Sequence, residues 1–222
     1  MEEVTLPVPE AVPSRRERNK QAKLDRIKQA AWTLFTQQGF AATTIREIAE
    51  HADVATGTVF LHVSDKADLL LMVFSDAIAQ RSAELFGPQR LQGPLGEVLS
   101  GLFTTFFELY RSHPGLARDF VRETLFHHGP WRDREIEQAK AFIARLAVFL
   151  SERQEAGEVR RDLDAQHFAF TLFGLYQAVL LGWLSGAFTY EEALTQLHVQ
   201  FEFQTTAVLV PAVPVSPPRD SR

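Results

Sequence analysis

The stretch TTIREIAEHADVATGTVFLHVSDKADLL, residues Thr43–Leu70, decides the fold. Thr44 opens a T-x-x-E capping box, which predicts a short helix through about His51. After a break of a few residues, a second short helix is predicted from Ala55 to about Val63. Two short helices joined by a tight turn form the helix-turn-helix arrangement, in which the second helix enters the DNA major groove. The stretch therefore predicts a DNA-binding unit.

The apolar residues of this stretch recur at the spacing expected for helices that pack on one another. The positions that we expect to be buried are Ile45, Ile48, Ala49, Ala52, Val54, Val59 and Val63. A preceding amphipathic helix, from about Lys23 to Gln38, ends at Gly39 and braces the pair. The three helices together make a small DNA-binding domain.

The rest of the chain continues in helical periodicity, and the predicted fold is all-α with about nine helices. Helices are expected from Asp65 to Gly87, Pro94 to Ser112, Pro114 to Gly129, Arg132 to Ala156, Asp164 to Gly186 and Thr189 to a point before Pro211. We expect a disordered arm over 1–13, the helix-turn-helix domain over 14–66, a larger effector-binding and dimerisation domain over 67–210, and a disordered tail over 211–222.

Composition excludes several function classes. The 222 residues include no Cys, so disulfides, thiolate catalysis and Cys-ligated metals are excluded. Neither a phosphate-binding Gly-rich loop nor a metal-binding His pattern is present, and we expect no metal, no cofactor and no enzymatic activity. The net charge is −5, yet Arg15–Lys28 holds seven basic residues, which suits contact with DNA at one end or simply a solvated helix face.

The same residues resemble the tetracycline-repressor (TetR/AcrR) family. The resemblance rests on Thr43-Thr44, Ala49, Ala52, Val54, Gly57-Thr58 and Lys66, and it is dense over about residues 23–70. The family's usual turn Gly is Asp53 here, and Asp tolerates a positive φ better than most residues. The usual Ser cap of the recognition helix is Ala55, the Lys after it is Thr56, and the Tyr-His-Tyr-like stretch is Phe60-Leu61-His62. These departures leave the operator sequence open.

A set of polar and exposed residues is predicted to contact DNA. Thr44, Thr58, His62 and Lys66 are assigned to phosphates, and Lys66 lies in the first turn of a helix whose N–H groups attract anions. Base edges are assigned to Arg46, Thr56, Gly57 and Leu61, with Phe60 beside them. Arg15, Arg16 and Arg18 are expected to follow the DNA backbone or enter a minor groove. For the Thr residues a helix-capping role is the alternative.

The run from Phe168 to Leu184 is almost wholly apolar, which predicts a helix buried on all sides. We expect it to form half of a four-helix dimer interface with the last helix, as the resemblance also implies. The predicted interface residues are Gly174, Ala178, Leu181, Gly182, Leu194, Leu197, Phe201 and Val208. Packing within one chain is the main alternative, and a membrane span is a remote one.

The middle helices are rich in Phe, and most of these residues are expected to form a packed core. The resemblance implies an effector cavity among them, and aromatic walls with a few polar groups suit an apolar or amphipathic ligand. The predicted lining is Phe103, Phe107, Tyr110, Phe120, Arg122, His127, Phe142, Phe173 and Gln177.

Together these features predict a cytoplasmic, homodimeric transcriptional regulator. It is expected to act as a repressor that releases an inverted-repeat operator in double-stranded DNA when a small-molecule effector binds. The alternative is a DNA-binding regulator or architectural protein with no small-molecule effector. An activator is compatible with the same motif.

Overall fold

The computed structural model describes residues 14–87 and 89–210, and within these residues the protein is built from nine helices and no strand. The predicted arm (1–13) and tail (211–222) lie outside the described residues. The helices are α1 (Arg15–Gln38), α2 (Ile45–His51), α3 (Thr56–Val59), α4 (Lys66–Leu85), α5 (Leu95–Ser112), α6 (Pro114–Phe126), α7 (Pro130–Glu155), α8 (Ala165–Leu184) and α9 (Tyr190–Thr206). The all-α prediction is confirmed.

Local sequence signals set most of the helix starts. Thr44 and Thr189 each accept a hydrogen bond from the backbone of a Glu three residues on, which completes two capping boxes. Asp65 and Asp164 cap α4 and α8 with their carboxylates. Pro114 occupies the first turn of α6, where its missing N–H costs nothing.

Helix α1 begins eight residues earlier than predicted, at Arg15. Ser14 and Glu17 form a third capping box, which fixes this start. Arg15, Arg16 and Arg18 therefore lie in the first helical turn. Their predicted contact with the DNA backbone or a minor groove would be made from a helix, and it stays a prediction.

The turn between α2 and α3 follows the prediction, while α3 is shorter than predicted. Asp53 has φ of 51°, the left-handed conformation that the family's usual Gly would adopt. Ala55 begins α3 without a side-chain cap. Helix α3 has four residues and ends at Val59, after which His62 N–H bonds to the Val59 carbonyl in a further turn.

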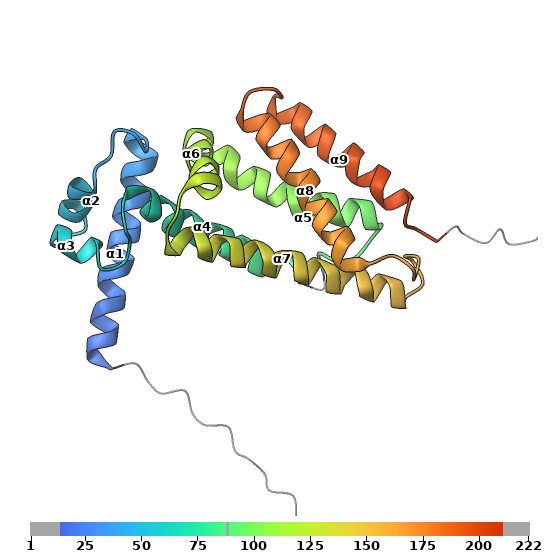
Figure 1. The fold of residues 1–222 in the computed structure, drawn as a ribbon, viewed down its shortest axis with the longest axis horizontal. Coiled ribbons are helices and arrows are strands. Elements are labelled where there is room, and N and C mark those ends of the chain that lie inside the picture. The colour runs from blue at the N-terminus through green and yellow to red at the C-terminus, as the bar shows by residue number, and fades with distance from the viewer. Residues whose placement is uncertain (1–13, 88, 211–222) are drawn as a thin grey trace, which may run out of the picture.

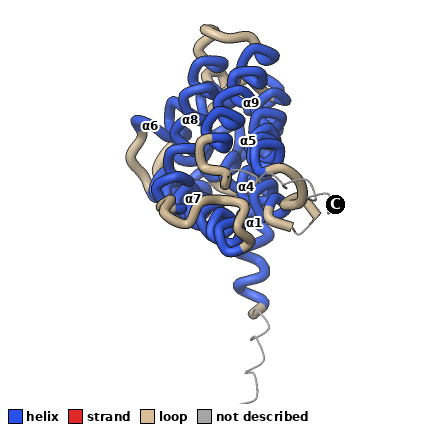
Figure 2. Tube along the Cα trace, turned by 90° about the vertical axis from the view of Figure 1, so that its right-hand side faces the viewer, coloured by secondary structure: helices blue, strands red, loops and turns tan. Residues whose placement is uncertain are grey.

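The helices form a small unit and a larger one joined through α4 (Figure 1). Helices α1, α2 and α3 lie together at one end, and α4 contacts α1 there. Along the rest of its length α4 packs on α5, α6 and α7, while α8 and α9 pack on α7 and α5 (Figures 1 and 2). Helix α4 thus belongs to both units.

Helix α8 is the one helix in 14–87 and 89–210 that is long and apolar enough to cross a membrane by length and composition. One side of it packs on α7 and α9 and buries Phe168, Leu172, Tyr176 and Leu180, among others. This partial burial is what a core helix of a helical bundle shows, so the apolar run is weak evidence for a membrane span.

Candidate nucleic-acid interface and effector cavity

The apolar residues of the helix-turn-helix are buried as predicted. Ile48 and Ala49 of α2 and Val59 of α3 have almost no exposed surface, and Val63 closes the same core after α3. Helix α1 covers them with Ile27, Ala30, Ala31 and Phe35. Because this face is fixed inward, the opposite face of α3 is presented to solvent.

The outward face of α3 and the turn after it carries the predicted base-reading residues. Thr56 and Gly57 are exposed, Phe60 is 51% exposed and Leu61 is 79% exposed. A Cβ at Gly57 would meet no atom within 4 Å, so the space in front of this backbone is open. Large apolar side chains held in water at such a place suit contact with a partner surface.

Two of the predicted DNA contacts are already engaged within α2. The Thr44 hydroxyl donates to the Glu47 carboxylate at 2.8 Å, and these Thr44 hydrogen bonds lower the pKa of Glu47. The capping alternative for Thr44 is therefore confirmed. The Arg46 side chain is largely exposed and pairs with Glu50, with 2.9 Å between Nε and Oε1. A solvent-exposed pair of this kind is weak, so Arg46 can exchange it for DNA.

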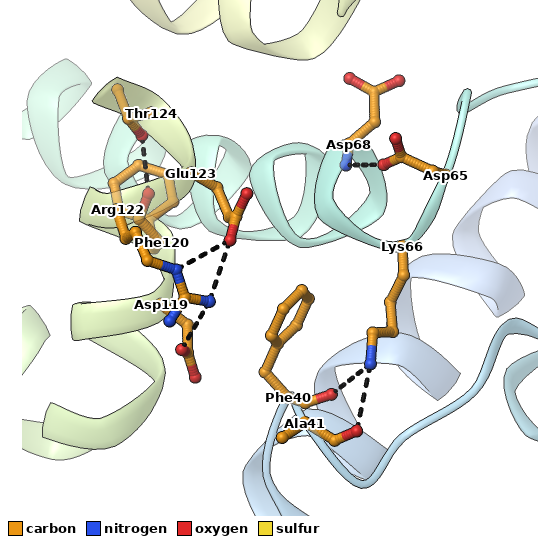
Figure 3. A network of polar contacts seen from close by, with 10 residues as sticks. All are labelled: Phe40, Ala41, Asp65, Lys66, Asp68, Asp119, Phe120, Arg122, Glu123 and Thr124. Carbon is orange, nitrogen blue, oxygen red and sulfur yellow. Dashed lines mark hydrogen bonds and ion pairs between the residues drawn. The ribbon is translucent and has the colours of Figure 1, made fainter. Parts of the chain in front are cut away.

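Lys66 has a different role from the predicted phosphate contact. Its Nζ donates to the carbonyls of Phe40 at 2.8 Å and Ala41 at 3.2 Å (Figure 3). It also donates to the Thr43 carbonyl at 2.9 Å and lies over the Phe40 ring. An ammonium has three hydrogens, and all three have acceptors here. Lys66 therefore ties the start of α4 to the connection between α1 and α2.

His62 is half-buried at the edge of the DNA-binding unit. Burial lowers the pKa of its imidazole, and the nearby Lys20 and Lys28 lower it further. A neutral imidazole still donates one hydrogen bond, so His62 can donate to a phosphate in its uncharged form.

A polar junction joins the DNA-binding unit to the start of α7. The Asp68 side chain is buried and accepts from the backbone N–H of Ser64 and of Trp131, each at 3.0 Å. A Cβ at Gly129 would lie 2.8 Å from Asp68 Oδ1 and 2.9 Å from His127 Nε2, so the close approach requires Gly there. This explains why the α6–α7 connection contains a glycine.

A cavity of about 480 Å³ lies in the larger unit, between α4, α5, α6, α7 and α8. Its size falls within the range of small-molecule sites. The lining is mainly aliphatic and aromatic, with a few polar groups. It consists of Ile78, Ser82, Phe106, Tyr110, Phe120, Val121, Thr124, Leu125, Arg132, Glu135, Ile136, Gln138, Ala139, Lys140, Phe142, Ile143, Phe170, Phe173, Tyr176, Gln177, Leu180 and Leu181.

The structure places the predicted effector residues in two groups. Those that line the cavity are Tyr110, Phe120, Phe142, Phe173 and Gln177. Phe103 and Phe107 do not, because they are fully buried against other rings, among them Phe201 and Trp183. Arg122 is held outside on α6 by Asp119 and Glu123 (Figure 3), and His127 lies 3.7 Å from Asp65 at the junction. The predicted cavity lining is therefore wrong for these four residues.

The sequence analysis missed Glu135, which is a buried carboxyl in the cavity wall. Its Oε2 accepts a hydrogen bond from the buried Ser75 hydroxyl at 2.5 Å, and burial raises the pKa of the carboxyl. Burial also raises the pKa of Tyr110 and Tyr176 in the same cavity. A signal existed, since Glu135 shares the spacing of the buried Phe142 and Leu146 on α7.

The predicted interface residues also divide into two groups. Gly174, Ala178 and Leu181 are exposed on α8, as an interface requires. Leu197, Phe201 and Val208 are buried within the chain and Leu194 is half-buried, while a Cβ at Gly182 would lie 2.5 Å from the Phe188 ring. The interface prediction is wrong for Leu197, Phe201 and Val208, whereas the half-buried Leu194 and Gly182 stay predictions. The unpredicted apolar residues that α8 and α9 expose are Phe170, Val199 and Phe203.

Comparison with known proteins places this arrangement in a family. Residues 27–73 match the family described as "Bacterial regulatory proteins, tetR family". The crystal structure of Thermus thermophilus FadR, a TetR-family transcriptional repressor in complex with lauroyl-CoA, is 30% identical, covers 87% of this chain and 98% of that one, and has a TM-score of 0.67.

Two Bacillus subtilis comparisons agree on the fold. FadR in complex with stearoyl-CoA has a TM-score of 0.66 at 21% identity and covers 83% of this chain and 99% of that one. The fatty acid metabolism regulator protein of strain 168 is 23% identical over 75% of this chain and 86% of its own length. With the helix-turn-helix and nine described helices, these matches show that the chain belongs to the TetR family of DNA-binding transcriptional regulators.

Proposed function

We propose that this protein is a homodimeric repressor that binds an inverted-repeat operator and releases it when an acyl thioester occupies the α4–α8 cavity. The DNA-binding domain is residues 14–66, and the effector-binding and dimerisation domain is residues 67–210. The protein acts in the cytoplasm, on double-stranded DNA, and no catalysis is involved.

The observation that carries the proposal is the connection between the cavity and the DNA-binding unit. Arg132 and Glu135 line the cavity from the first two turns of α7. Trp131, beside them, is hydrogen-bonded to His62 and Asp68 in and next to the DNA-binding unit. A ligand that alters the position of α7 therefore acts on the end of the recognition segment, which supports coupling between effector and operator binding.

The cavity wall supports an effector with a long apolar part. Most lining side chains are hydrocarbon, and Phe106, Phe142 and Phe173 supply an aromatic wall. Lys140 and Arg132 supply positive charge at the same cavity, which suits the phosphates of a coenzyme A group. The related Thermus thermophilus FadR was crystallised with lauroyl-CoA, and the same class of ligand is proposed here.

The α3 segment is proposed to read the operator. Thr56 and Gly57 approach base edges, and Leu61 contacts a thymine methyl group. Thr58 and His62 bind phosphates as uncharged donors, and Arg46 adds a cation after exchanging Glu50. Phe60 fills the space beside them. The charge balance supports this end as the DNA contact, because Arg15–Lys28 adds basic residues on α1.

Dimerisation is proposed through the apolar residues that α8 and α9 leave exposed. One short recognition segment offers limited contact, so a twofold dimer that binds two half-sites suits this motif. Phe203 on α9 is 70% exposed and Phe170 on α8 is 64% exposed. Residues of this size in water are stabilised by burial against a second copy.

The test is selection of fragments of the source genome by the purified protein at two salt concentrations, followed by release with lauroyl-CoA. We expect an inverted repeat, a steep fall of affinity with salt, and release by the thioester. Binding without sequence preference would contradict sequence-specific regulation. Specific binding that no acyl thioester changes would favour the alternative regulator without an effector.

A further inference from the structure

Glu135 is the one carboxyl among the residues that line the cavity, and it is 8% exposed. The Ser75 hydroxyl on α4 donates to its Oε2. The other carboxyl oxygen, Oε1, has no hydrogen-bond partner within the described part of the chain and is not among the fully buried, unpaired polar atoms. Because Glu135 lines the cavity and Ser75 occupies Oε2, Oε1 is the oxygen left for a ligand.

A carboxyl at this position is costly without a function. Burying a polar group that lacks a partner destabilises a fold, and burying its charge costs far more. The tie to Ser75 links α7 to α4, but it uses one oxygen only. A packed apolar residue would serve the core equally well, and it would leave no hydrogen-bond donor for a ligand.

We propose that Glu135 recognises the effector, as an uncharged acid that donates its hydrogen from Oε1 to an uncharged oxygen of the ligand. The oxygen is the carbonyl of the acyl thioester, so this inference rests on the proposed function. It deepens that function by naming the residue that separates an acyl thioester from a hydrocarbon chain of the same length.

Burial favours the uncharged form of Glu135. Burial raises the pKa of the carboxyl, and Ser75 is its only hydrogen-bond partner in the described residues. The titratable groups that line the same cavity are Tyr110 from α5, Tyr176 from α8, and Arg132 and Lys140 from α7; α4 and α6 contribute none. No ion pair joins Glu135 to either base in the described chain, so its neutral form is favoured.

An uncharged Glu135 also predicts which ligands the cavity binds less tightly. A free fatty acid would bring an ionised carboxylate into this mainly apolar cavity, and removing that charge from water costs more than removing an uncharged thioester carbonyl. A thioester carbonyl accepts the same hydrogen bond without charge. The cavity is therefore expected to bind lauroyl-CoA more tightly than lauric acid.

The experiment compares two probes that differ in a single oxygen. Lauroyl-CoA has the thioester carbonyl, and S-dodecyl-CoA is the thioether that lacks it. Their dissociation constants are measured by calorimetry with the full chain. One hydrogen bond predicts that the wild type binds lauroyl-CoA about 3- to 10-fold more tightly than S-dodecyl-CoA. In Glu135→Leu this ratio is expected to fall to about 1, whereas Glu135→Gln, which keeps a donor, retains it.

The pH dependence of the ratio tests the mechanism without relying on the Leu variant to fold. Ionised Glu135 has no hydrogen to donate, so the wild-type ratio should decline as pH rises through the raised pKa of this carboxyl. Both probes carry the same phosphates, whose titration cancels in the ratio. In Glu135→Gln the ratio should not change with pH. Glu137→Gln, an exposed carboxyl of α7 that pairs with Lys140, is the matched control and should behave as wild type.

The outcomes separate the two proposals. Failure of both probes to bind overturns the acyl thioester as effector, and this inference with it. Binding with equal affinity in the wild type, or a ratio that Glu135→Leu leaves unchanged, overturns only the role of Glu135. A pH-dependent ratio in Glu135→Gln also counts against it.

Discussion

The indole Nε1 of Trp131 donates a hydrogen bond of 3.0 Å to the backbone carbonyl of His62. The bond joins the first turn of α7 to the segment that follows the recognition helix, 69 residues away in the sequence. The Trp131 backbone N–H binds Asp68 at the same place, and Lys28 of α1 and Arg134 lie against the indole ring. Trp131 of α7 thus contacts α1, the segment after α3 and the first turn of α4.

Trp131→Phe should weaken this junction, because it removes the indole N–H while keeping an aromatic side chain at this position. We expect a loss of about 1 kcal/mol in the free energy of unfolding, because one partly buried hydrogen bond is removed. Release of operator DNA by the effector should also weaken, since the link to His62 is lost. Urea unfolding and operator titrations with and without lauroyl-CoA measure the two effects. Trp183→Phe, a half-buried indole stacked on Phe107, is the control; equal effects from both variants would argue against a special junction.

Lys66→Met should destabilise the DNA-binding unit without changing the salt dependence of DNA binding. The ammonium holds three carbonyls, and their loss is expected to cost about 2 kcal/mol in the free energy of unfolding. The slope of log affinity against log salt should match the wild type, because Lys66 has no free hydrogen for phosphate. If the slope in Lys66→Met is instead reduced by about 1, the original assignment of Lys66 to a phosphate is correct.

Asp53→Ala should destabilise the protein, whereas Asp53→Gly should not. The φ of 51° costs an ordinary L-residue about 1 kcal/mol, and Gly avoids that cost. The ion pair of Asp53 with Arg26 spans 3.2 Å but is exposed, so its loss in both variants contributes little. Thermal and urea unfolding of the two variants side by side would settle the matter; a larger loss in the Gly variant contradicts the turn argument.

Phe203→Glu should convert the proposed dimer to monomers. The change places a charge where burial against a second copy is expected, and a buried unpaired charge is strongly unfavourable. Light scattering coupled to size-exclusion chromatography gives the mass. Val148→Glu replaces another exposed apolar residue, on α7 outside the proposed interface, and should leave the mass unchanged. A monomeric wild type, or a dimeric Phe203→Glu protein, would refute this interface.

Glu135→Gln should be more stable than the wild type at neutral pH, and the advantage should vanish in acid. Above the usual Glu pKa of 4.5 the unfolded chain ionises, while the folded carboxyl stays protonated up to its raised pKa. The wild type therefore loses stability as pH rises through this window, and the Gln variant does not. Urea unfolding at pH 4.5 and 7.5 measures the difference. A stability gap that is the same at both values would show that the carboxyl is ionised in the fold.

The sequence predicted those features that depend on neighbouring residues. The capping boxes at Thr44 and Thr189 and the left-handed Asp53 are local, and each is found where predicted. The start of α1 was equally local, because Ser14 and Glu17 form the same signature. The predicted start at Lys23 follows the first large apolar residue of the helix, Leu24, whereas Ser14 caps the helix ahead of a polar and charged stretch.

Features that depend on three-dimensional packing were predicted less well. Helices α8 and α9 are apolar on more than one side, and periodicity alone does not say which side faces its own chain. Phe201 is therefore buried internally while Phe203 is exposed. The same problem affects the aromatic residues of α5. Phe103 and Phe106 are three positions apart, yet only Phe106 lines the cavity. Lys66 had acceptors 23–26 residues away, which no local pattern indicates.

The anchoring of α4 means that a small tilt of this helix moves the DNA-binding unit by a larger distance. Lys66 and Asp68 attach the start of α4 to the DNA-binding unit through the Phe40 carbonyl and the Ser64 N–H, and the 20 residues of α4 make a rod of about 30 Å. A tilt of only about 5° along such a rod displaces one end by roughly 3 Å relative to the other. In the proposed twofold dimer, the change in distance between the two α3 segments is twice that displacement. A small movement at the cavity is thereby converted into a displacement comparable with the rise of one base pair. Half-site spacing is measured on the same scale.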